Sequence, residues 1–253
     1  MTTASKIIIT ILSIVTVLVI LFALFFRGFK NLVFDSGSSL HIEEGNEELD
    51  GTPSGIDINV SCADVTVRYG SEFSVDYSMP RDLVPTVKFE NGILTVKNGG
   101  ANVRIPVNYS GKLYINVTIP EGTELDKASI NVDAGNIDIS GIKADTLTLD
   151  IDAGNIDVKD IEAEKIEVDC DAGNLDVEGC ITDKFIIKLD AGNADIDDCT
   201  IDTIDANVDA GSLDANHCTI NGGTCDVSLG NISLSGNIGD VKTNASLGNV
   251  EIH

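Results

Sequence analysis

Aspartate recurs at fixed intervals in the second half of this sequence, in a pattern that could bind cations. The phrase DAGNIDI starts at Asp133, and variants of it follow at one constant spacing. Each copy places one aspartate two places before a glycine and a second three places after it. The first row is Asp133, Asp152, Asp171, Asp190 and Asp209, and the second row is Asp138, Asp157, Asp176, Asp195 and Asp214. Carboxylates are the hard oxygen ligands that Ca²⁺ takes in proteins.

Two interpretations of these rows compete. If the copies stack at the strand spacing of about 4.8 Å, carboxylates of neighbouring copies repel by on the order of 1 kcal/mol per pair in water. Divalent cations would relieve that repulsion, as Ca²⁺ does in nonapeptide β-rolls. The unit here is more than twice as long as a nonapeptide and offers one such turn. The sequence therefore favours a solvated acidic face with no metal or other cofactor, and a Ca²⁺-dependent β-roll is the alternative.

The six cysteines contain no CxxC pair, so their spacing suits neither a zinc site nor thioredoxin-like redox chemistry. Cys180, Cys199 and Cys218 occupy the place in the repeat that Ile142 and Ile161 hold in earlier copies, which indicates small buried hydrophobes. Stacked neighbours would also lie within disulfide range. Free thiols and a bond from Cys199 to either neighbour therefore both stay open.

Catalytic patterns are sparse. The histidines are His41, His217 and His253, and none stands in an HExxH or nucleophile-elbow setting. Regular repetition gives no aspartate an environment unlike that of its neighbours, which an acid and base pair requires. We predict that the protein is not an enzyme. A hydrolase acting on surface polysaccharide is a distant alternative.

A repeat over residues 128–253 predicts the fold. Its glycines keep one spacing that shortens only at the last step, and they are Gly135, Gly154, Gly173, Gly192, Gly211, Gly230 and Gly248. The residues two and four places after each glycine are apolar in every copy, and those 7, 12, 14 and 16 places after it are apolar in most. Side chains therefore alternate inward and outward in two strand segments per copy. One copy cannot bury its apolar row alone, so we predict an all-β fold, a parallel β-solenoid of about seven 19-residue coils.

The glycine of each copy predicts a turn with positive φ. The asparagine that follows it in most copies, such as Asn136 and Asn155, would stack its side-chain amide along that turn.

Residues 55–127 show a different pattern and form the N-terminal β region of the predicted domain. Apolar residues alternate with polar ones over 56–69, 72–79, 86–98 and 112–120, which is typical of short strands. Asn91 and Gly92 lie between two apolar runs and predict a tight hairpin.

The N-terminal segment predicts a membrane anchor. After a short tail, residues 1–6, the stretch from Ile7 to Phe26 (7–26) carries no charge and is long enough to cross a bilayer as a helix. The residues that follow do not form a small-residue cleavage site, so we expect the anchor to be retained. Lys6 lies on one side of it, and Arg27 and Lys30 lie on the other, so charge alone does not set the orientation. Residues 27–54 are expected to be a tether.

The net charge of −25 excludes two classes of partner. Nucleic acid and anionic lipid surfaces both repel so acidic a chain.

Three passages together resemble the bacterial adhesin-like repeat domains of unknown function. They are IDINVSCADVTVRYGSEFSVDY, PTVKFENGILTVKNG and, most specifically, IPEGTELDKASINVDAGNIDI. The resemblance implies membrane anchoring, an extracellular domain and a role in the cell envelope, and it carries no catalytic motif. The expected function is thus an adhesin-like structural or interaction module in the cell membrane. A regulatory part in envelope-stress signalling is the alternative.

The last copies of the repeat lose their charge. Residues 131–253 hold 26 acidic and six basic residues, or −20, whereas 228–253 hold Asp240, Glu251 and Lys242, or −1. In the final copy, SLGNVEI, serine replaces the first aspartate. We predict a docking surface here, formed by Ser246, Asn249 and Glu251, for another copy or another envelope protein.

Overall fold

The computed structural model describes residues 32–35, 41–99, 103–106 and 111–253. The predicted membrane helix over 7–26 lies outside them. Within the described ranges, no helix has both the length and the hydropathy needed to cross a membrane.

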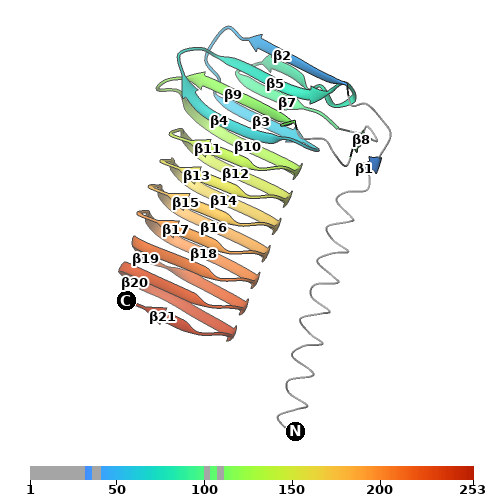
Figure 1. The fold of residues 1–253 in the computed structure, drawn as a ribbon. Coiled ribbons are helices and arrows are strands. Elements are labelled where there is room, and N and C mark those ends of the chain that lie inside the picture. The colour runs from blue at the N-terminus through green and yellow to red at the C-terminus, as the bar shows by residue number, and fades with distance from the viewer. Residues whose placement is uncertain (1–31, 36–40, 100–102, 107–110) are drawn as a thin grey trace.

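The repeats form the predicted parallel β-solenoid, with about seven turns. Each turn consists of a long strand followed by a short one, and each strand pairs with its counterpart in the next turn. Figure 1 shows the turns as successive layers of a stack. The long strands are β10 (Glu124–Ala134), β12 (Lys143–Ala153), β14 (Glu162–Ala172), β16 (Ile181–Ala191) and β18 (Thr200–Ala210). The short strands are β11 (Ile137–Ser140), β13 (Ile156–Lys159), β15 (Leu175–Glu178) and β17 (Ala194–Asp197). In β19 (Leu213–Leu229) and β20 (Ile232–Leu247) the two segments run on as one strand, and β21 (Val250–Ile252) ends the stack.

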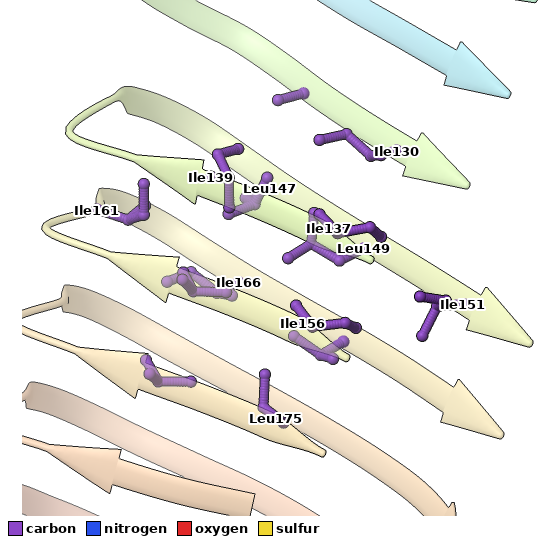
Figure 2. Close-up of a cluster of buried hydrophobic side chains, with 14 of the residues drawn as sticks. Ile130, Ile137, Ile139, Leu147, Leu149, Ile151, Ile156, Ile161, Ile166 and Leu175 are labelled. Carbon is purple, nitrogen blue, oxygen red and sulfur yellow. The ribbon is translucent and has the colours of Figure 1, made fainter. Parts of the chain in front are cut away.

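The core is a set of apolar columns between the two strand layers. The parallel register sets Ile130 beside Leu149 and Ile137 beside Ile156, and every one of these side chains is at most 1% exposed. Figure 2 shows these side chains pointing into the space between the layers. The predicted apolar rows are confirmed, because alternation turns every second residue of each strand inward.

The glycine turn has the predicted positive φ, for example +148° at Gly135 and +147° at Gly154. A Cβ atom built on Gly154 would lie 1.5 Å from the carbonyl oxygen of Gly135 in the preceding turn. The same clash recurs at Gly173, Gly192, Gly211, Gly230 and Gly248. The column therefore admits no side chain at this position, for steric reasons as well as conformational ones.

Asparagine side chains link successive turns beside the glycines. Asn155 donates its backbone N–H to Oδ1 of Asn136 over 3.0 Å, and Asn174 donates to Asn155 over the same distance. Asp64 begins the series by accepting from Asn136. The expected stacking of amides is thus a ladder of side-chain to backbone hydrogen bonds, each worth on the order of 1 kcal/mol.

The first turn of the stack lies in the N-terminal β region. Strand β3 (Gly55–Val60) pairs in parallel with β10, and β4 (Asp64–Gly70) pairs in parallel with β11. One constant offset in sequence sets Ile58 beside Ile130 and Val65 beside Ile137. Residues 55–127 and 128–253 therefore share one continuous sheet, where the sequence predicted two successive regions.

Beyond this turn, the strands change direction and cover the end of the stack. Strands β7 (Ile93–Lys97) and β9 (Tyr114–Pro120) still pair in parallel with β3 and β4. Strand β6 (Thr86–Glu90) then pairs antiparallel with β7 through the predicted Asn91-Gly92 hairpin, and β5 (Ser74–Pro80) pairs antiparallel with β9. A 3₁₀ turn spans Arg81–Leu83.

The expected tether over 27–54 is wrong in part. Residues Ile42–Glu48 form strand β2, which pairs antiparallel with β5 along its whole length. The segment is acidic and has little apolar periodicity, so the sequence gives no sign of this strand, which is held mainly by backbone pairing. A separate parallel pair joins β1 (Leu32–Asp35) to β8 (Val103–Pro106).

We predict that Gly154→Ala lowers the free energy of unfolding by more than about 3 kcal/mol, because the new methyl group has no space beside the Gly135 carbonyl. Gly141→Ala is the matched control. Its φ is +70° and nothing lies within 4 Å of the added atom, so only the backbone cost of about 1–2 kcal/mol applies. Urea denaturation of both variants measures the difference, and equal losses would contradict the steric account.

Candidate functional site: the acidic faces and the last turns

The two aspartate rows lie on opposite sides of the glycine turn, and both point outward. Asp133 follows the buried Val132, and Asp138 stands between the buried Ile137 and Ile139. The register sets Asp138 beside Asp157 and then Asp176, so the second row runs straight along the stack. The first row occupies the long-strand layer and the second row the short-strand layer. The predicted ladders therefore form as two separate rows.

Burial and like charge act together on the first row. The pKa of Asp171 is raised to about 6, first by partial burial and then by the carboxylates of Asp190 and Asp152 above and below it. Partial burial also raises the pKa of Asp152 and Asp190, with a neighbouring aspartate adding to it. These groups therefore carry a cost of ionisation at neutral pH.

The second row behaves in the same way. Partial burial raises the pKa of Asp157, Asp176 and Asp195, and in each case the carboxylate of the next turn raises it further. Lys159 opposes the rise at Asp157 and Asp176.

Lysines neutralise acids beside the rows. Lys188 Nζ lies 3.1 Å from Asp169 Oδ2, and Lys143 Nζ lies 2.6 Å from Glu162 Oε2. Across the part of the chain that the structure describes, no ion pair engages a carboxylate of either row. In the same residues, no three His, Cys, Asp or Glu side chains converge as a metal-binding group. The rows present their carboxylates singly, one per turn.

The cysteine column fills the core, as its place in the repeat indicates. Cys180, Cys199 and Cys218 are each 1% exposed, and all six cysteines are free thiols. The backbone N–H of Cys180 donates to Cys199 Sγ over 3.3 Å. Burial raises the pKa of Cys170 and Cys225 to about 12, so those thiols stay protonated. His217 lies at the other turn, exposed and with a φ of +54°, as a surface residue.

The last turns expose the residues predicted for docking. Ser246, Asn249 and Glu251 are all exposed, and the apolar Leu247 and Ile252 beside them are 68% and 49% exposed. The Asn249 N–H donates to Asn231 Oδ1 over 3.1 Å and so continues the asparagine ladder. The structure thus brings the three residues together with an apolar patch that the sequence did not single out.

Sequence reasoning also missed a groove along one narrow edge of the solenoid. It encloses about 320 Å³ where strands β10, β12, β14 and β16 begin. Its floor is Ala144, Ala163 and Thr182. The sequence does contain a sign of the groove. These three residues stand nine places after a glycine, where later copies have the larger Ile201 and Ile220, so the small side chains indicate unfilled space.

The family model described as Toastrack DUF4097 matches residues 54–253. No match is found among curated proteins. A solved structure from Bacteroides fragilis NCTC 9343, described as a "putative adhesin", is 17% identical with a TM-score of 0.55, covering 85% of this chain and 98% of its own. A second, from Parabacteroides distasonis ATCC 8503 and described as a "putative lipid binding protein", is 16% identical with a TM-score of 0.50, covering 88% and 100%. At these identities the likeness shows the fold alone.

We predict that the protein melts at a higher temperature at pH 5 than at pH 7.5. The pKa of Asp171 is about 6 in the folded protein and about 3.9 in an unfolded chain, so its stabilising contribution is full below about pH 4 and is lost as pH rises through 6. Asp171→Asn should raise the melting temperature at pH 7.5 and reduce its pH dependence. Asp240→Asn, which removes a charge outside both rows, is the control. If both variants respond alike, the raised pKa of Asp171 is not the cause of the pH dependence.

Proposed function

We propose that this chain, which belongs to the Toastrack DUF4097 family by the match over residues 54–253, is a non-catalytic, adhesin-like interaction module of the bacterial cell envelope. One observation carries the proposal: the turns share one uninterrupted apolar core and therefore form a stiff rod with repeated surfaces. A stiff rod presents binding surfaces at fixed positions at little entropic cost. The outward aspartates of each row have nearly identical neighbours, which suits a solvated face better than catalysis.

We place the rod outside the cell on a single-pass anchor formed by residues 7–26. The anchor is an inference from the uncharged stretch that begins at Ile7, and the orientation rests on the family resemblance. The net charge of −25 supports a role away from the anionic headgroups of the bilayer, because like charges repel at short range. The same charge argues against nucleic acid as a partner.

We assign docking to the last turns, with Ser246, Asn249 and Glu251 facing another copy or another envelope protein. Two observations support this surface. The charge falls from −20 over 131–253 to −1 over 228–253, so an acidic partner can approach this end. Leu247 and Ile252 add exposed apolar area that a contact would remove from water.

A photo-reactive side chain at position 249 of the full-length protein in living cells tests this proposal. We expect a cross-linked adduct from position 249 and none from position 176, an exposed control on the second row. Protease added to the intact cells should remove the adduct, because both partners lie outside. No adduct from position 249 would contradict the docking surface, and an adduct resistant to protease would contradict the location.

Calcium binding is the alternative to a solvated acidic face, because a bound cation would relieve the repulsion between neighbouring carboxylates, which raise the pKa of each other in both rows. We expect no saturable heat on titration with Ca²⁺ up to about 1 mM, the weak end of extracellular calcium sites, because the carboxylates of each row project singly. Saturable heat that Asp171→Asn abolishes would establish the calcium function in place of a merely solvated face.

A further inference from the structure

The edge groove owes its existence to side-chain size. The register sets Leu125, Ala144, Ala163, Thr182 and Ile201 in one column. Leu125 and Ile201 fill their positions and are at most 1% exposed. The three small residues between them leave room for a ligand side chain in three consecutive turns, over about 10 Å along the stack.

Two exposed apolar side chains, Ile181 and Ile93, lie on this edge in different turns. Ile181 is 56% exposed and forms one wall of the groove. A second hollow of about 330 Å³ adjoins it at the start of β10, where Asp126 and Lys127 are lining residues, and this hollow contains Ile93, which is 40% exposed. All other exposed large hydrophobic residues of the described ranges lie in the last turns. The edge therefore carries apolar area of its own, separate from the docking end.

Carboxylates line the rim of the groove. Asp145, Glu164 and Asp183 follow the three floor residues directly, are exposed, and stand one per turn. On the other rim, Lys143 is engaged by Glu162 at 2.6 Å. The rim is thus acidic and its only lysine is already paired, so the groove repels anionic headgroups and attracts cations beside an apolar floor.

We propose that this groove binds a cationic amphipathic peptide segment, with apolar side chains on Ala144, Ala163 and Thr182 and basic side chains on the carboxylates of the rim. Apolar floor and charged rim together match a chain that carries both kinds of group at short intervals. An extended segment of about four to five residues spans the groove, from β10 to β16, at roughly 3.3 Å per residue. This site lies on the side of the rod and goes beyond the docking function proposed for its end.

A ten-residue peptide that alternates leucine and lysine is the probe, titrated against the full-length protein in neutral detergent and followed by fluorescence anisotropy. A lysine and serine peptide of equal charge is the control ligand and should bind at least about tenfold more weakly, because it lacks the apolar contacts. Ala163→Leu fills the floor and should raise the Kd of the first peptide at least about tenfold. Ile181→Ser removes an exposed wall without touching the core, and the Kd should rise about threefold or more.

Charge variants separate the groove from general attraction to an acidic protein. Asp145→Asn with Glu164→Gln should weaken binding about threefold to tenfold, whereas Asp176→Asn with Asp195→Asn, which removes the same charge from the second row, should change it less than about twofold. Melting temperatures of the four variants confirm that each is folded. Equal binding of both peptides, or equal effects of the two charge pairs, would each overturn the proposal. Cross-linking from position 249 is unaffected by these outcomes.

Discussion

The structure depends on the close contact between glycines of successive turns. With the carbonyl oxygen of one glycine 1.5 Å from where the next Cβ would lie, no other residue allows the turns to stack at strand spacing. That contact fixes the register, and the register places every apolar row above its own copy. In the turns that follow Ala63, which holds this place in the first turn, the core, the asparagine ladder and the outward acids all follow from the contact between glycines.

The same regularity has an electrostatic cost. Identical turns put like side chains at like positions, so each outward aspartate lies above another, and partial burial with mutual repulsion raises the pKa of Asp171 to about 6. The fold tolerates this because each pair repels weakly in water, while the buried columns of each turn contribute far more. Departures from regularity then mark the surfaces that differ chemically: the small residues Ala144 and Ala163 open a groove, and Ser228 ends the first acidic row.

Most of the solenoid was predictable from sequence, since glycine spacing and alternation along each strand determine strands, turns and core. The first turn was not recognised, although Ile58 to Val60 and Ile130 to Val132 share the sequence INV, because the intervening strands lengthen the interval and break the period. Strand β2 was missed because Glu43 and Glu47 do not contribute to an apolar pattern. Its strand conformation depends on backbone pairing with β5, which the sequence does not reveal. The groove was missed because small residues at this position resemble ordinary core residues in the sequence. Only the register shows that the larger Leu125 and Ile201 flank them in the same column.

Gly55 to Gly70 form the first turn of one continuous solenoid, whose stiffness underlies the proposed role. Amide hydrogen exchange resolved by mass spectrometry measures whether they do. We expect β3 and β4, covered on one side by β10 and β11 and on the other by β7 and β9, to exchange as slowly as β12 and β14. Fast exchange over 55–70 beside slow exchange over 143–172 would show two independent units and contradict the claim.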